Sequence, residues 1–225
     1  MVQRLRITFA RHNGVKYLAH LELMRMWERA LRRAGWRPVY SQGFNPHPKI
    51  NFAAALPVGV AGDAELMEVQ LEIPRPVEQA AGELAAQLPS GFELRGVQEF
   101  PLDAPTLQRS LRAAEYVARC PQEVSEEQLH HQAERLLAAA QLIRERKKES
   151  KVQSYDLRPM IHVLEVNCDL AGYPVVRMTL RADAQGAGRP DEVLREMGID
   201  PAGCDITRTQ LLMSISWPLG ATGAE

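Results

Sequence analysis

Polar and apolar positions change their period several times in the first hundred residues, which predicts alternating strands and helices. Residues 4–9 alternate with period two, as in a half-buried strand, and residues 20–34 have apolar side chains at helical spacing before Gly35. The apolar helical positions are Leu21, Met24, Trp27 and Leu31. Further strands are expected at residues 50–56, 64–73 and 92–100, with a helix at residues 77–88.

The same order of elements is expected a second time after a proline-containing stretch without periodicity. It consists of a strand at residues 114–120, a long Ala, Leu and Glu helix at 125–146, a hairpin at 160–168 and 173–182, a helix at 190–197 and a strand at 204–213. The order β-α-β-β-α-β is the split βαβ, or ferredoxin-like, arrangement. The sequence therefore predicts an α+β protein with two tandem ferredoxin-like units and antiparallel sheets, at residues 1–100 and 114–216. Residues 101–113 are the expected linker and residues 217–225 a flexible tail.

Composition places the chain among ordinary folded proteins. Of its 225 residues, 45% are hydrophobic and 24% are charged, and no run of about 18 apolar residues predicts a membrane span. The first residues alternate where a signal peptide would be continuously apolar. The three cysteines are far apart and show no metal-ligand or cluster spacing. We therefore expect a cytoplasmic protein without a membrane segment, a disulfide framework or a metal site.

Charge is distributed unevenly along the chain despite a net charge of −1. Residues 1–50 contain ten Lys and Arg against two acids, whereas residues 51–108 contain two Arg against nine acids. This split favours a positive face that meets an anion. The alternative is that the two segments pair with each other in the folded chain.

A row of arginines on the first predicted helix is the first candidate for such a face. Arg25, Arg29 and Arg32 are three and four residues apart, so they project from one side of the helix, and guanidinium groups match phosphate oxygens. RNA or another polyanion is the ligand that this pattern favours. An ordinary solvated helix face explains the same pattern without a ligand.

The segment that follows this helix combines several kinds of binding side chain in one stiff loop. Residues 40–49 read Tyr-Ser-Gln-Gly-Phe-Asn-Pro-His-Pro-Lys, in which two prolines at alternate positions disfavour a helix. Aromatic rings stack on bases, amide and imidazole groups form hydrogen bonds, and lysine contacts phosphate. The loop is therefore a candidate RNA-binding element, although turn residues also have purely structural roles.

A second basic run, Arg144–Lys151, is expected at the end of the long helix, where cations also complement the helix dipole. It is followed by Asp156 and Arg158, which we place on one face of a strand. These two side chains could hold a ligand, or they could form a pair that fixes the entry to the hairpin.

Acid–base catalysis is an alternative for the N-terminal region. Tyr17, His20, His47 and Lys49 include groups that move protons near neutral pH and stabilise developing phosphate charge. Together they would cleave RNA without a metal. No nucleotide-binding, dinucleotide-binding or serine hydrolase motif occurs in the chain.

Four segments carry a family resemblance: residues 17–25 (YLAHLELMR), 29–35 (RALRRAG), 40–49 (YSQGFNPHPK) and, after the basic run, 156–161 (DLRPMI). Together they resemble the bacterial DUF2344 family of radical SAM-linked proteins. The resemblance implies a radical SAM protein as partner and a setting among ribosomal proteins and RNA processing. Any S-adenosylmethionine, iron–sulfur cluster or cobalamin would belong to that partner, because this chain has no cluster-binding cysteine motif and we expect no cofactor in it.

These observations together predict a noncatalytic accessory protein that binds RNA, or a ribosome-related ribonucleoprotein, for a radical SAM enzyme. Phosphate contacts are expected from Arg25, Arg29, Arg32, Lys49, Lys147, Lys148 and Lys151, stacking from Tyr40 or Phe44, and polar contacts from Gln42, Asn45, His47, Asp156 and Arg158. One alternative is a metal-independent endoribonuclease similar to the CRISPR RNA-processing Cas6 enzymes. The other is a protein-interaction module that docks the radical SAM partner without RNA.

Overall fold

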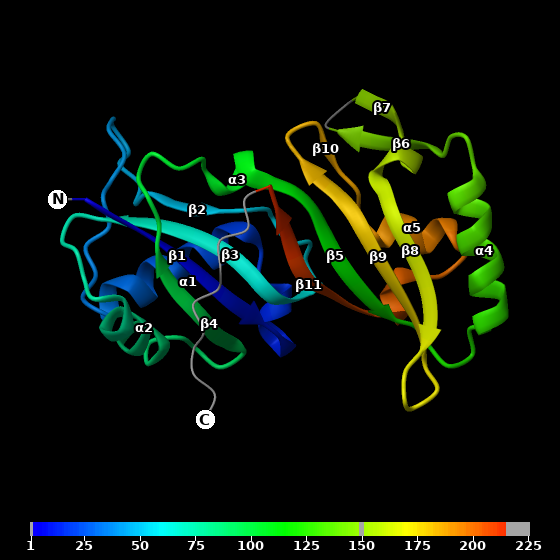
Figure 1. The fold of residues 1–225 in the computed structure, drawn as a ribbon, viewed down its shortest axis with the longest axis horizontal. Coiled ribbons are helices and arrows are strands. Elements are labelled where there is room, and N and C mark those ends of the chain that lie inside the picture. Colours follow the sequence, from blue (N-terminus) through cyan, green and yellow to red (C-terminus); the bar gives the residue numbers. More distant parts are fainter. Residues whose placement is uncertain (1, 149–150, 215–225) are drawn as a thin grey trace. The chain divides into compact units, whose positions relative to one another are not determined.

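A computed structural model describes residues 2–148 and 151–214 of the chain. It divides into two compact units (Figure 1). Unit 1 extends to Leu111 and includes the chain again from Met213, and unit 2 is Arg112–Leu212. Both units combine helices with antiparallel strands, which confirms the α+β class expected from the sequence.

Unit 1 contains the first β-α-β-β-α-β series. Its four strands are hydrogen-bonded in the order β2-β3-β1-β4, and every neighbouring pair is antiparallel. The elements are β1 (Gln3–Arg11), the 3-10 turn η1 (Asn13–Tyr17), α1 (His20–Arg33), β2 (Ile50–Phe52), β3 (Ala61–Leu71), α2 (Val77–Ala85), β4 (Phe92–Glu99) and the short helix α3 (Leu107–Ser110). The last of these lies in the stretch that was expected to be an irregular linker.

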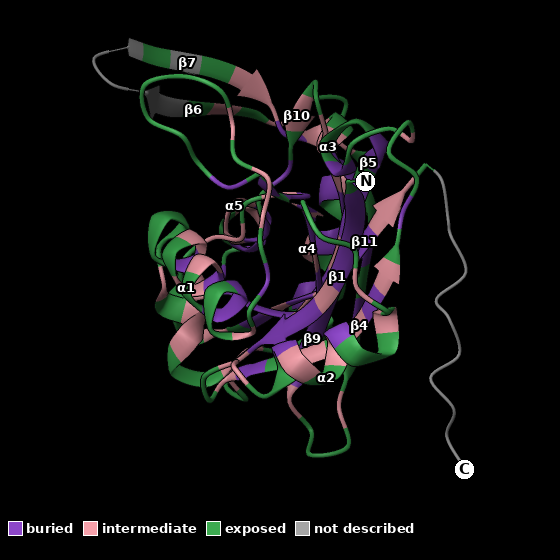
Figure 2. Ribbon diagram, turned by 90° about the vertical axis from the view of Figure 1, so that its left-hand side faces the viewer, coloured by how far each residue is buried: buried purple, intermediate pink, exposed green. Residues whose placement is uncertain are grey.

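The core of unit 1 lies between the sheet and the two longer helices. Strand residues that face one side of β1 and β3 pack against residues of α1 and α2. The indole of Trp27 meets the ring of Phe9 edge-on, with 4.8 Å between ring centroids. Helix α1 has buried positions on its inner side and exposed positions on its outer side (Figure 2).

One position of the expected helix stripe was wrong. Leu21 is 69% exposed, and Leu23 takes the buried position instead. The buried stripe of α1 therefore runs through Leu23, Trp27 and Leu31, which are four residues apart. A helical stripe that begins at Leu21 and one that begins at Leu23 fit the sequence almost equally well. Packing against the sheet decides which of the two leucines is buried.

Unit 2 contains the second series with an inserted hairpin. Strand β9 pairs with β5 on one edge and with β8 and β10 on the other, and β5 also neighbours β11. The elements are β5 (Leu111–Arg119), α4 (Glu126–Ala138), β6 (Ile143–Lys148), β7 (Lys151–Asp156), η2 (Arg158–Met160), β8 (Ile161–Cys168), β9 (Pro174–Asp183), β10 (Gly186–Ala187), α5 (Pro190–Glu196), η3 (Pro201–Gly203) and β11 (Asp205–Met213).

The long helix predicted at residues 125–146 was wrong in its second half. Helix α4 ends at Ala138, and the basic residues that follow form strand β6, which pairs with β7. The Asp156 carboxylate accepts a hydrogen bond from the Leu142 N–H at 2.8 Å, and the Leu157 N–H donates to the Leu142 carbonyl at 2.8 Å. These contacts between distant residues override the helix propensity of the Ala, Arg and Lys run.

No helix within residues 2–148 and 151–214 is long and apolar enough to cross a membrane.

Candidate functional site

A cavity of about 580 Å³ lies in unit 1 beside the outer side of helix α1. One wall comes from the helix itself, and the other comes from the segment that leads from the helix into the following loop. The helix contributes Arg25, Glu28, Arg29 and Arg32, and the opposite wall contains Trp36, Arg37, Pro38, Tyr40, Pro48 and Glu72. The cavity therefore contains the three arginines that the sequence singled out, together with one aromatic residue of the predicted loop.

Local hydrogen bonds fix the start and the end of helix α1, which carries the arginines. At its start, the Ala19 N–H donates a hydrogen bond to the Glu22 carboxylate at 2.8 Å, which satisfies one of the free amides of the first turn. At its end, Gly35 has a φ of 70°, and the N–H groups of Gly35 and Trp36 donate to the carbonyls of Arg32 and Leu31. This is a Schellman motif, which confirms Gly35 as the helix stop.

The same motif builds the opposite wall of the cavity. The chain turns at Gly35, and the Trp36 side chain is buried directly after it. The backbone then runs along β3: the Val39 N–H donates to the Gln70 carbonyl at 2.8 Å, and the Glu72 N–H donates to the Arg37 carbonyl at 2.9 Å. Residues 37–40 are thus held as an added strand segment that faces the helix across the cavity.

The cavity is electropositive, because four guanidinium groups line it against two carboxylates. Arg25, Arg29, Arg32 and Arg37 are exposed, and none of them has an ion pair or side-chain hydrogen bond within the described part of the chain. Unpaired guanidinium groups keep their full capacity to bind an anion, and their fork geometry suits phosphate oxygens.

The loop beyond the cavity is tied at its base and open at its tip. Tyr40 and Pro48 form a β-bridge, the Ser41 N–H donates to the His47 carbonyl at 2.8 Å, and the His47 N–H donates to the Ser41 hydroxyl at 3.0 Å. Along the chain, the loop lies between α1 and β2.

Four predicted site residues lie on this loop outside the cavity lining. They are Gln42, Phe44, Asn45 and His47, all exposed, with the Phe44 ring fully open to solvent. The structure therefore brings Tyr40 to the arginines and leaves the remaining loop residues as a separate projecting group.

Lys49 lies at a different hollow. It lines a smaller cavity of about 100 Å³ together with Arg4, Asn51, Glu68 and Thr106. Lys49 and Glu68 thus lie near the second face of the sheet, which is the face turned away from α1 and α2. The structure separates Lys49 from the arginines of α1, although all were expected to contact one ligand.

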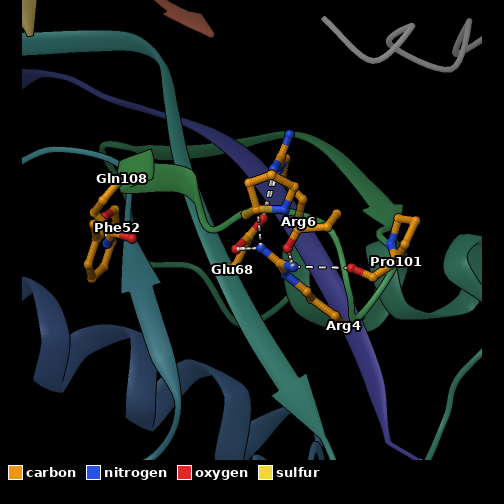
Figure 3. Close-up of polar contacts among 8 residues, drawn as sticks. Arg4, Arg6, Phe52, Glu68, Pro101 and Gln108 are labelled. Carbon is orange, nitrogen blue, oxygen red and sulfur yellow. Dashed lines mark hydrogen bonds and ion pairs between the residues drawn. The ribbon is translucent and has the colours of Figure 1, made fainter. Parts of the chain in front are cut away.

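The second face of the unit 1 sheet holds a buried ionic cluster. One Glu68 oxygen lies 2.6 Å from Arg4 Nη2, and the other lies 2.8 Å from Arg6 Nη2 (Figure 3). The Arg6 guanidinium also lies 3.6 Å from the centroid of the Phe100 ring. Arg4 donates further hydrogen bonds to the carbonyls of Pro101, Ala104 and Pro105. Here the basic and acidic segments do pair, as the alternative interpretation of the charge split proposed.

The four residues of the catalytic alternative are not joined to one another. His20 starts α1, and its ring lies 5.6 Å from the Phe52 ring, centroid to centroid. Tyr17 belongs to η1, whereas His47 and Lys49 belong to the loop and its base. Among the described residues, no hydrogen bond or ion pair links any two of these four side chains.

The predicted site residues of unit 2 have a different environment. Arg158 donates to the carbonyls of Leu137 and Ile161, and Asp156 accepts from the N–H groups of Leu142 and Arg158. The two residues are not on one strand face as expected, because Arg158 lies in η2, and their contacts tie the end of α4 to the start of β8.

The predicted phosphate contacts of unit 2 belong to the hairpin. Lys147 and Lys148 are on β6 and Lys151 is on β7; their side chains lie outside the described part of the structure.

Sequence reasoning missed the wall opposite the helix. Trp36, Arg37, Pro38 and Pro48 line the cavity, and none of them was assigned to the site. One signal was present: a glycine that ends a helix in a Schellman motif folds the next residues back over the helix terminus.

Metal-ligating side chains do not gather in the described residues: no group of three or more His, Cys, Asp or Glu there could hold an ion. Cys120, Cys168 and Cys204 are all free thiols.

The fold and the cavity define an α+β protein with an arginine-lined cavity in its first unit. The chain belongs to the DUF2344 family, described as uncharacterized proteins conserved in bacteria, which matches residues 4–190. A search of curated proteins gave no match.

Solved structures give only distant likenesses. A putative glycine cleavage system transcriptional repressor is 12% identical, with 88% of this chain and 90% of that chain covered and a TM-score of 0.25. An oxyferrous complex of DtpA from Streptomyces lividans is 11% identical, with 100% and 90% covered and a TM-score of 0.26. These TM-scores are too low to support an argument about fold or function.

Proposed function

We propose that this protein is a noncatalytic accessory protein that binds RNA, or a ribonucleoprotein, for a radical SAM partner enzyme. The observation that carries the proposal is the cavity of unit 1, which four unpaired arginines line together with the exposed ring of Tyr40. Single-stranded RNA is the form of ligand that this combination suits best.

The spacing of the arginines supports a strand of RNA along the helix. Arg25, Arg29 and Arg32 share one side of α1 and extend over about 10 Å of its length, at about 1.5 Å per residue. Arg37 adds a fourth cation from the opposite wall. A chain of phosphates that lies in the cavity can contact several of these cations at once.

The aromatic wall supports a single strand in preference to a duplex. Tyr40 is 50% exposed and lies on the cavity, between Pro38 and Pro48. Bases in a duplex are stacked on one another, but bases of a single strand are free to stack on an aromatic ring. Phe44, on the loop tip, offers a second ring to the same strand.

The direct test measures RNA binding by the full chain against salt. A labelled single-stranded RNA of mixed sequence is titrated with the wild type and with Arg29→Glu, at about 50 to 200 mM salt. We expect Arg29→Glu to weaken binding and to reduce the salt slope by about 0.7 for each phosphate that the protein no longer neutralises. Arg95→Glu is the matched control, because Arg95 is an exposed arginine on β4 with the same charge change and lies outside the cavity.

Two results would contradict the proposal. Equal affinities and slopes for the wild type and Arg29→Glu would remove RNA from this cavity. A duplex of the same sequence that binds as tightly as the single strand would contradict the role of the aromatic wall. Crosslinking in the native cells, with recovered RNA sequenced for both variants, then identifies the bound RNA.

In this proposal the radical SAM partner supplies S-adenosylmethionine, the iron–sulfur cluster and any cobalamin. Support comes from the family resemblance, and the three cysteines of the sequence do not have the spacing of a cluster-binding motif. Co-purification of the two proteins after nuclease treatment tests the partnership. Association that persists shows direct contact between the proteins, and association that disappears shows that RNA bridges them.

We also infer that both units are variants of the ferredoxin-like fold. The strand order β2-β3-β1-β4 in unit 1, and the order β8-β9-β5-β11 in unit 2, support this inference, because each follows a β-α-β-β-α-β element order. The hairpin β6–β7 is then an insertion between the first helix and second strand of the second unit. An experimental structure of the full chain is the test.

A further inference from the structure

Two cysteines of unit 2 that are 84 residues apart in sequence meet in the fold. The Cys204 Sγ lies 3.6 Å from the Cys120 Sγ and donates a hydrogen bond to it. Cys120 directly follows β5, and Cys204 lies between η3 and β11. We propose that this thiol pair is a modification site at which hydrogen peroxide forms a Cys120–Cys204 disulfide.

A backbone hydrogen bond fixes each of the two chain segments, and the segments pack against each other at Gly203 and Pro121. The Cys120 N–H donates to the Pro174 carbonyl at 2.8 Å, and the Cys204 N–H donates to the Pro201 carbonyl at 3.1 Å. Gly203 lies so close to Pro121 that an added Cβ would be 3.3 Å from its ring. Because a disulfide has an S–S length of about 2.05 Å, the two sulfurs need to approach by only about 1.5 Å.

The surroundings assign different roles to the two sulfurs. The hydrogen bond from the Cys204 thiol lowers the pKa of Cys120, and the same hydrogen bond, together with burial, raises the pKa of Cys204. The thiolate therefore forms at Cys120. Cys120 is 1% exposed, so the oxidant has to be as small as hydrogen peroxide and reaches it past the half-buried Cys204.

The reaction balances with peroxide as the only oxidant. The Cys120 thiolate attacks one peroxide oxygen, the O–O bond breaks, and hydroxide leaves with the electron pair. Cys204 gives its proton to that hydroxide, and its sulfur attacks the sulfur of the Cys120 sulfenic acid. The S–O bond breaks and the departing oxygen takes up a proton as water. Two thiols and one peroxide thus become one disulfide and two waters, and an added dithiol reverses the change.

The test uses the reduced full chain, treated with hydrogen peroxide and then with a maleimide that blocks free thiols. We expect two fewer blocked thiols, the loss of two hydrogens from the intact mass, and a peptide that joins Cys120 to Cys204. Dithiothreitol should restore all three free thiols. The peptide map uses the wild type, so the result does not depend on whether a cysteine variant folds.

Substitutions identify the pair. Cys168→Ser is the matched control, because Cys168 is the third cysteine, and it should leave the disulfide unchanged. Cys120→Ser and Cys204→Ser should each abolish it. Three blocked thiols after peroxide treatment, a disulfide that includes Cys168, or sulfinic acid at Cys120 without a bridge would overturn the proposal.

Discussion

Two groups of arginines in unit 1 have opposite environments. Arg4 and Arg6, on β1, are buried against one carboxylate, that of Glu68, and Arg6 also lies over an aromatic ring. The arginines of the cavity are exposed and unpaired within the described residues. The first group connects the sheet to the segment that follows β4, and the second leaves its charge available to a ligand.

The difference shows that the charge of a segment does not determine what its arginines do. Both groups belong to the basic first fifty residues, and an acidic segment follows both in the sequence. Their positions on the fold separate the two groups. Arg4 and Arg6 alternate along β1 and point to the second face of the sheet, whereas the outer side of α1 points to solvent. Four variants test this distinction.

The largest effect is expected where the buried pairing is broken. Glu68→Gln keeps the shape of the side chain but leaves Arg4 and Arg6 buried without a counter-charge. We expect the free energy of unfolding to fall by about 3–5 kcal/mol. Denaturant titration measures it, and Glu72→Gln, at an exposed carboxylate of the cavity, should change it by no more than about 0.5 kcal/mol.

The next effect concerns the ligand and not the fold. Tyr40→Ala removes the exposed ring of the cavity and should weaken binding of single-stranded RNA by about 1–3 kcal/mol. Tyr40→Phe keeps the ring and should bind RNA like the wild type. If both variants bind equally well, stacking at this position is contradicted.

A smaller effect, on the free energy of unfolding, is expected when one of the unpaired arginines of the cavity is removed. Arg25→Ala removes an exposed guanidinium without a partner in the described structure, so the free energy of unfolding should stay within about 0.5 kcal/mol. Thermal unfolding checks this expectation. A clear loss of stability would mean that Arg25 has a structural role similar to that of Arg4.

The smallest effect is expected at Arg119 and Asp169 of unit 2, a half-buried ion pair that resembles the buried cluster of unit 1. In unit 2 the Arg119 guanidinium lies over the Tyr173 ring and contacts Asp169, whose pKa is lowered mainly by the hydrogen bond from the Tyr173 N–H and also by Arg119. A lowered folded-state pKa stabilises the protein above the ordinary Asp pKa, and this contribution is lost as pH falls through the lowered value. Asp169→Asn should therefore reduce the dependence of stability on pH in that acidic range, as measured by unfolding at several pH values.

Much of the fold was predictable because local signals agreed with it. The strand at β1, the stop of α1 at Gly35 and the β8–β9 hairpin follow from alternation, glycine and turn residues. The end of α4 was not predictable, since no glycine or proline marks it and strand β6 exists only through pairing with β7.

The site was partly predictable for the same reason. Helical spacing alone places Arg25, Arg29 and Arg32 together, and the structure adds Tyr40 to them. The loop sequence suggested one continuous surface, but Pro48 lines the arginine cavity and the adjacent Lys49 lines another hollow, because neighbouring residues of an extended chain point to opposite sides.

The β-bridge between Tyr40 and Pro48 has a consequence for how this family can diversify. Because the bridge and the hydrogen bonds between Ser41 and His47 close the loop at its base, the length and sequence of residues 42–46 can change while the walls of the cavity keep their places. In the proposed complex with RNA, affinity for the phosphate backbone and selectivity for the bases are then encoded in separate pieces of the chain. Exchange of the loop between relatives is a route to new specificity that leaves the common anchor intact.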